Sequence, residues 1–385
     1  MASQAFVPTD PEVPVPPPLS TIEASSVDLH ASDSATLNRD SCCSSRSSRS
    51  AKFKFDGIYS SATRLPDSLV SRAKQGDPSA CFDAAKLVSE GLPIDHNEWK
   101  LAAQLFKAAA ERGNLEASFQ MAWVAFLGEG MVKNDRRALW FWQEVSSKST
   151  DPVLKPIATH MVGWMHYLGR GTPLDKQNGI KTIRDNQSDD FKLGEDECLV
   201  KWWNNVKSES PTAHKFFELC QSGSDRDWLC SHLMAVCLFH GFGTTQDQTR
   251  AARTFEQLAN DGHSDSQVWI GMSYDYGDGV SRDLVRAFEW YSKSTKQDNS
   301  YGQWRVGRCY YYGRGVAKDK RKAFEWFSKS AEQGNRYGQC WVGWCRNEGD
   351  GVPKDIDSAI FWWQQSADQG NRDAITTLKY LGKWP

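Results

Sequence analysis

The sequence predicts an all-α protein, an α/α solenoid of stacked helix pairs, because three observations coincide. A Gly-x-Gly pair recurs with a step of 36 residues, an aspartate follows each pair by six residues, and an alanine comes four residues later. A fixed period of this length is typical of helical repeats, in which each unit covers the apolar face of its neighbour. The pairs in register are Gly241/Gly243, Gly277/Gly279, Gly313/Gly315 and Gly349/Gly351.

Each position of the unit has a structural role. Residues 301–312 predict a first helix, in which Gly307 removes a side chain where the second helix must come close. The Gly-x-Gly turn supplies positive φ. Asp319 then predicts the N-cap of a second helix over 320–332, and Gly334 ends that helix. Aromatic residues of the second helix fill the space between units.

The chain divides into a tail, residues 1–65, and a solenoid, residues 66–385, of about eight helix pairs. The stretch 182–225 lacks a glycine pair, so we expect a divergent pair of helices over 195–207 and 211–222. Residues 372–381 predict a capping helix.

The tail has the composition of a disordered segment. It holds 14 serines, six prolines and no tryptophan, so it cannot bury enough apolar area to offset the entropy of ordering. Residues 11–18 are proline-rich and fit either a ligand of an SH3 or WW domain or a plain linker. Residues 41–50 fit either a kinase substrate or a solvated serine-rich tail, and Cys42 and Cys43 are candidates for reversible acylation.

The unit 301–335 resembles the Sel-one-like repeat (SLR), a relative of the tetratricopeptide repeat. The resemblance is close over 265–370, moderate over 115–181 and 226–262, and poor in the remaining units. It implies a right-handed superhelical solenoid that scaffolds protein complexes. Similar members serve in signalling, in fungal cell-wall and septum regulation, and in ubiquitin-ligase assemblies of the endoplasmic reticulum. An adaptor in such a ubiquitin-ligase assembly is the alternative function for this chain.

Composition narrows the partners and the location. The net charge of −2 argues against a nucleic-acid binder that works through a basic field. We expect no membrane span, because no run of about 18 apolar residues occurs, and no secretory signal in the first thirty residues. The ten cysteines are irregularly spaced, which favours a reducing compartment. We therefore expect the cytoplasm, with the nucleus as the alternative.

The residues predict no catalytic, cofactor or metal site. The glycine pairs are helix-terminating turns, because a helix rather than a strand precedes them. The histidines lack the spacing of metal ligands, and Cys81, Cys220 and Cys309 are expected as small buried residues. Some secreted bacterial members of the SLR family carry a cysteine pair in each repeat, and β-lactam binding or hydrolysis has been proposed for them. This chain departs from that pattern, since only Cys230/Cys237 and Cys340/Cys345 are close pairs.

The expected function is therefore that of a non-enzymatic adaptor that holds a peptide or helix of a protein partner in its concave groove. In tetratricopeptide-like solenoids the first helix of each unit lines this groove. Aromatic residues with Arg, Asn and Asp on that helix resemble the centre of a protein interface. For Trp164, Trp304 and Trp344, packing within the solenoid is the alternative. The predicted groove residues are His160, Trp164, Tyr167, Val268, Met272, Asp275, Tyr301, Trp304, Arg308, Tyr311, Tyr337, Trp344 and Asn347.

Overall fold

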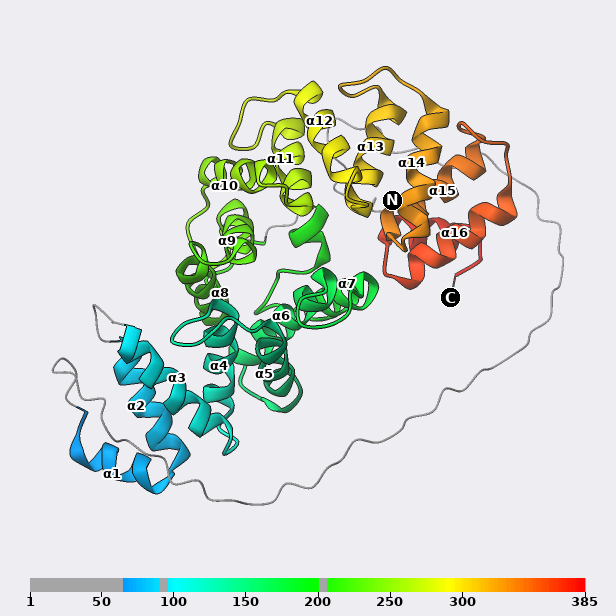
Figure 1. The fold of residues 1–385 in the computed structure, drawn as a ribbon. Helices are drawn as coiled ribbons and strands as arrows, with labels where there is room; N and C mark the ends of the chain where they lie inside the picture. The colour runs from blue at the N-terminus through cyan, green and yellow to red at the C-terminus, as the bar shows by residue number, and fades with distance from the viewer. Residues whose placement is uncertain (1–64, 91–95, 201–205, 385) are drawn as a thin grey trace, which may run out of the picture. The chain divides into compact units, whose positions relative to one another are not determined.

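The computed structural model describes residues 65–90, 96–200 and 206–384. They all belong to the second of two units of the chain, Phe53–Pro385. The proline-rich segment and the serine-rich segment with Cys42 and Cys43 lie outside the described residues. Within the described ranges the protein is all-α, with 17 α-helices, one π-helix and no strand beyond an isolated bridge between Ser208 and Phe242. The predicted fold class is confirmed (Figure 1).

Consecutive helices pack as pairs, and each pair packs on the next (Figure 1). The first helix of each pair is called the inner helix and the second the outer helix; a Gly-x-Gly turn joins them in every pair except the first. A short helix, α1 (Asp67–Gln75), precedes the first pair, and α17 (Arg372–Tyr380) follows the last. The pairs are α2 (Pro78–Glu90) and α3 (His96–Ala110), α4 (Leu115–Leu127) and α5 (Asp135–Lys148), α6 (Leu154–Leu168) and α7 (Lys176–Asp185), α9 (Trp228–His240) and α10 (Gln248–Asn260), α11 (Ser264–Tyr276) and α12 (Leu284–Thr295), α13 (Ser300–Tyr312) and α14 (Lys320–Glu332), and α15 (Arg336–Glu348) and α16 (Ile356–Asp368).

Glycines on the inner helices let an aromatic ring of the outer helix lie against the backbone. A Cβ at Gly307 would lie 2.5 Å from Cδ1 of Phe327, and one at Gly343 would lie 2.6 Å from Cδ1 of Trp363. Both contacts are too short for a carbon atom. The predicted role of Gly307 is therefore confirmed, and the ring occupies the space that a side chain would need.

Aspartates cap the outer helices as predicted. The side chain of Asp319 accepts a hydrogen bond from the backbone N–H of Lys322, which satisfies a free donor of the first turn. Asp247, Asp283 and Asp355 cap their helices in the same way.

A row of glutamine side chains joins the two ends of each of the last three repeats. The Nε2 atoms of Gln297, Gln333 and Gln369 donate to the side-chain oxygens of Gln267, Gln303 and Gln339, at 3.2, 2.8 and 2.8 Å. Donors and acceptors each recur every 36 residues, so the same bond forms once in each of these three repeats. We call this row the glutamine ladder.

In the divergent stretch the second expected helix is present as α8 (Pro211–Gly223). Of the helix expected over 195–207, residues Asp196–Val200 form a π-helical turn, η1, and residues 201–205 lie outside the described residues. Side chains of other repeats donate to two carbonyl oxygens of this turn. Trp269 donates to the carbonyl of Cys198, and Arg305 donates to the carbonyl of Val200.

A substitution at Gly315 tests the close backbone contact made by the Gly-x-Gly turn. Its φ is +70°, and a Cβ would lie 2.0 Å from the carbonyl oxygen of Leu284 in the preceding outer helix. We expect Gly315→Ala to lower the free energy of unfolding by about 3 kcal/mol, from positive φ and overpacking together. Gly113→Ala is the control, because φ is +89° there and nothing lies within 4 Å of the added carbon; it should cost only about 1 kcal/mol. Urea unfolding measures both, and equal losses would contradict the close-contact argument.

Candidate functional site

The predicted groove residues lie mostly in the interior. Trp164 and Trp304 are buried, as the packing alternative expected, and His160 and Met272 are fully enclosed. Arg308, Tyr311 and Trp344 are half-buried. The ten buried members of the set are His160, Trp164, Tyr167, Val268, Met272, Asp275, Tyr301, Trp304, Tyr337 and Asn347.

A segment of the same chain covers much of this inner face. Residues 191–200, here called the insert, run from the end of the α6–α7 repeat through η1. The hydroxyl of Tyr301 donates to Oε1 of Glu195 at 2.7 Å, and the hydroxyl of Tyr337 donates to Oδ1 of Asp196. The tyrosines predicted to face a partner therefore hold the chain's own carboxylates.

Two arginines neutralise the most buried of these carboxylates. The side chain of Glu195 is 1% exposed and lies 2.7 Å from Nε of Arg184 and 3.2 Å from Nε of Arg336. Arg336 also pairs with Asp196. Burial raises the pKa of Glu197, although the backbone N–H of Gly194 donates to that carboxyl at 3.1 Å. Removing one partner of such a buried pair leaves an uncompensated charge, so the insert and its arginines depend on each other.

The helix before the insert also reaches distant repeats. Nη2 of Arg184 lies 3.4 Å from Oε1 of Gln369, and Nζ of Lys176 lies 3.3 Å from the carbonyl oxygen of Asp298. In the preceding helix, the hydroxyl of Tyr167 donates to Oδ1 of Asp265 at 2.9 Å. The α6–α7 repeat is therefore bonded to repeats far along the chain as well as to its neighbours.

Three members of the predicted groove set keep accessible surface. The guanidinium of Arg308 lies 5.4 Å from the ring centroid of Trp304. Trp344 packs edge-on against Trp363, with 5.7 Å between ring centroids. The hydroxyl of Tyr311 donates to Oδ2 of Asp350 at 2.6 Å. Partner binding by this set stays a prediction.

The thiols predicted to be buried are buried. Cys81, Cys220 and Cys309 are core residues, and burial raises the pKa of each thiol, that of Cys309 to about 12. Within the described ranges no three His, Cys, Asp or Glu side chains are grouped as metal ligands. None of the helices described is both long enough and apolar enough to span a bilayer.

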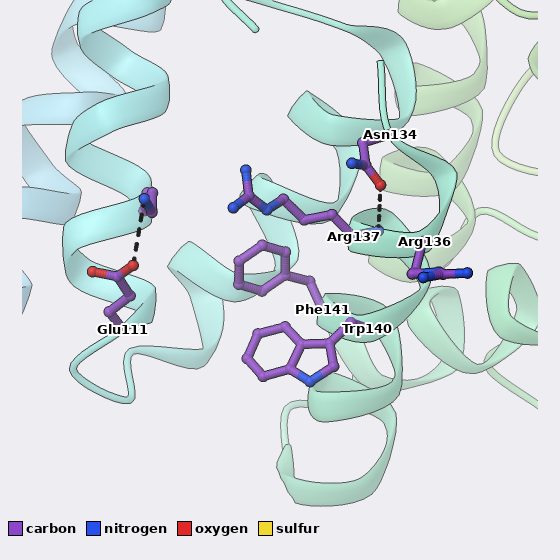
Figure 2. Close-up of a pocket in the computed structure, with 7 residues that line it drawn as sticks. Glu111, Asn134, Arg136, Arg137, Trp140 and Phe141 are labelled. Carbon is purple, nitrogen blue, oxygen red and sulfur yellow. Dashed lines mark hydrogen bonds and ion pairs between the residues drawn. The ribbon is translucent and has the colours of Figure 1, made fainter. Parts of the chain in front are cut away.

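An open cleft lies between α3 and α5, away from the insert (Figure 2). Its volume is about 410 Å³. The ring of Trp140 is 51% exposed at this cleft, and it packs edge-on against Phe141 with 4.8 Å between centroids. Arg137 extends toward α3, whereas Arg136 points away from it. The lining residues are Lys107, Glu111, Asn134, Arg136, Arg137, Trp140 and Phe141.

The cleft combines an apolar floor with a positive rim. Three of its lining side chains are cations and one, Glu111, is an anion. Glu111 forms an ion pair with Lys107, with 3.6 Å between Oε1 and Nζ. Asn134 caps α5 by accepting from the backbone N–H of Arg137 at 2.9 Å, which holds the first turn beside the cleft. The arrangement suits a large apolar side chain flanked by carboxylates.

Sequence reasoning missed Trp140, although the repeat register contains a signal for it. Asn134 aligns with the capping Asp319, so Trp140 aligns with Glu325 and, one repeat earlier, with Glu289. Both glutamates are exposed. The repeat thus needs no ring at this position, and a tryptophan there is unexplained by packing.

Two buried histidines predict an acid-sensitive fold. Burial lowers the pKa of His160 and of His232 from 6.5 to about 3. Nε1–H of Trp164 donates to Nε2 of His160, and the Nδ1 atom of His232 lies 2.9 Å from the Ser266 hydroxyl.

Because the unfolded chain binds protons that the folded chain cannot, stability should be full above pH 6.5 and fall as the pH drops toward 3. Each histidine should remove about 1.4 kcal/mol per pH unit below 6.5. Urea unfolding at pH 8 and pH 5 measures this slope. Replacing both histidines with glutamine should flatten it, whereas an unchanged slope would contradict the assignment.

A known repeat family matches most of the helix pairs described above. The Sel1 repeat model matches seven segments: 78–114, 115–146, 156–181, 229–263, 264–299, 300–335 and 336–371. No curated protein matches the chain.

Among solved structures, a protective antigen of uropathogenic Escherichia coli displaying an SLR fold is 24% identical with a TM-score of 0.40, covering 82% of this chain and 66% of that one. A Sel1 repeat protein from Oxalobacter formigenes is 21% identical with a TM-score of 0.39, covering 82% and 89%. Cysteine rich protein B of Helicobacter pylori is 21% identical with a TM-score of 0.29, covering 33% and 95%. The resemblance predicted from residues 301–335 is confirmed by the matched segments, and the chain belongs to the Sel1 repeat family.

Proposed function

We propose that the protein is a non-enzymatic adaptor that holds a segment of a partner protein in the α3–α5 cleft. Sel1 repeat proteins are typically scaffolds for protein–protein interaction. The observation that carries the proposal is Trp140, a half-exposed ring that lines a cleft at a position where two other repeats have Glu289 and Glu325. Tryptophan and arginine supply most of the anchoring energy in protein interfaces, and both are present here.

The partner segment is acidic and carries one large apolar side chain. Trp140 and Phe141 provide the apolar contact, and the cleft of about 410 Å³ accommodates such a side chain. Arg137 extends toward α3 and Lys107 lines the α3 side of the cleft, so a carboxylate beside the anchor finds a charged donor. An arginine-bearing partner would meet like charges and be disfavoured.

The remaining parts of the proposal concern setting and secondary contacts. The protein acts in the cytoplasm or the nucleus, in signalling or in cell-wall regulation. Residues 11–18 bind an SH3 or WW domain. Arg308, Tyr311 and Trp344 form a second contact on the inner helices, since they keep accessible surface.

The substitution Trp140→Glu tests the cleft without disturbing the repeat. Glutamate is the residue of the equivalent positions 289 and 325, so the variant should fold normally. Loss of a tryptophan anchor should weaken binding of a purified partner by about 30-fold, as measured by calorimetry. Arg137→Glu should act in the same direction.

Phe361→Ala is the matched control, because Phe361 is 53% exposed at the same repeat position in the last repeat. It should leave the affinity unchanged. The partner is first taken from affinity purification of the wild-type chain, and its bound region is mapped by crosslinking. Equal affinity of the wild-type and Trp140→Glu chains, or a bound region without carboxylates, would overturn the proposal.

A further inference from the structure

The inner helices hold the insert through equivalent positions of successive repeats. Trp269 and Arg305 stand 36 residues apart, at the same place in α11 and α13. Nε1 of Trp269 donates to the carbonyl oxygen of Cys198 at 2.7 Å, and Arg305 donates to the carbonyl oxygen of Val200. One repeat step on the solenoid therefore corresponds to a step of two residues on the insert.

Equivalent positions also hold the side chains of the insert, here with a step of one residue for each repeat. Tyr301 and Tyr337 are also equivalent, and their hydroxyls donate to the carboxylates of the successive residues Glu195 and Asp196. Arg336, adjacent to Tyr337, pairs with both carboxylates. Main-chain and side-chain groups of one short segment are thus recognised by a periodic row of donors, as a bound peptide is.

The insert meets the surface at its N-terminal side. Ser188, Asp189 and Asp190 are exposed, whereas Phe191 and Leu193 are buried in the core. Phe191 belongs to a cluster of rings with His160, Phe216 and Phe242. Residues 191–193 therefore anchor the N-terminal side of the insert. Residues 194–200 lie on the inner face, where Cys198, Leu199 and Val200 are also buried, so apolar contacts hold them as well as the donors.

We propose that the inner face of α11, α13 and α15 is a binding surface for acidic peptide segments, and that residues 194–200 are its intramolecular occupant. A partner segment with two successive carboxylates, matching Glu195 and Asp196, replaces this occupant at Tyr301, Tyr337 and Arg336. This surface is separate from the α3–α5 cleft and does not depend on the function proposed there.

Exchange is unfavourable unless the contacts of the insert are weakened, because a tethered segment competes at an effective concentration in the millimolar range, about 1 mM. The more exposed of the two acidic contacts is that of Asp196, whose side chain is 28% exposed, against 1% for Glu195. Asp196→Asn removes a charge there without leaving Glu195, the more buried carboxylate, unpaired. It should release residues 194–200 while α9–α16 stay folded.

A labelled peptide of residues 193–200 is the probe, titrated into the full chain and followed by fluorescence anisotropy. It should bind the Asp196→Asn chain at least tenfold more tightly than the wild-type chain. Adding Tyr301→Phe and Tyr337→Phe to that variant should abolish the gain, and so should an asparagine at the peptide position that corresponds to Asp196. Trp140→Glu should leave the peptide affinity unchanged. Equal binding to both chains, with circular dichroism unchanged, would overturn the proposal.

Hydrogen exchange on the wild-type chain provides a test that needs no variant. Residues 194–200 should exchange through a local opening, at least tenfold faster than the interior of α13. If their amides exchange only together with α13, the insert is a permanent part of the core and the proposal fails, whatever the variant does.

Discussion

The second glycine of each Gly-x-Gly pair lies directly against the first turn of the preceding outer helix, where no side chain fits. A Cβ at Gly279 or Gly351 would lie 2.1 Å from a backbone carbonyl oxygen of that turn. The contact requires positive φ and an absent side chain at the same residue, so only glycine satisfies it. Because it recurs once per unit, it sets the distance between repeats, and the ring contacts, caps and glutamine ladder follow at the same spacing.

The features that could be predicted from the sequence are those that each repeat makes with itself or its neighbour. Gly307 and Asp319 recur in register, and their roles depend on local backbone geometry, so their positions were sufficient to predict them. The environment of Tyr301 required more, because its hydroxyl bonds to a segment that lies across the inner face. That segment includes Glu195, which is 106 residues from Tyr301 and carries no repeat marker.

Trp140 was missed for a different reason. The sequence contained the signal, since aligning the repeats places this ring where Glu289 and Glu325 stand. The residue at this position differs among the repeats, so packing does not dictate it. The consistent part of a repeat describes the fold, and an exposed ring at a variable position is the basis of the proposed cleft.

The glutamine ladder ends at Gln369, and this last side chain also contacts Arg184 on α7. An array whose units touch only their neighbours frays from its ends, one unit at a time. Here Gln369 of the final unit is hydrogen-bonded to Arg184 of α7, 185 residues earlier in the chain. Arg336 of the same unit also pairs with Glu195 and Asp196. Tension applied to the C-terminus is therefore shared with the middle of the molecule.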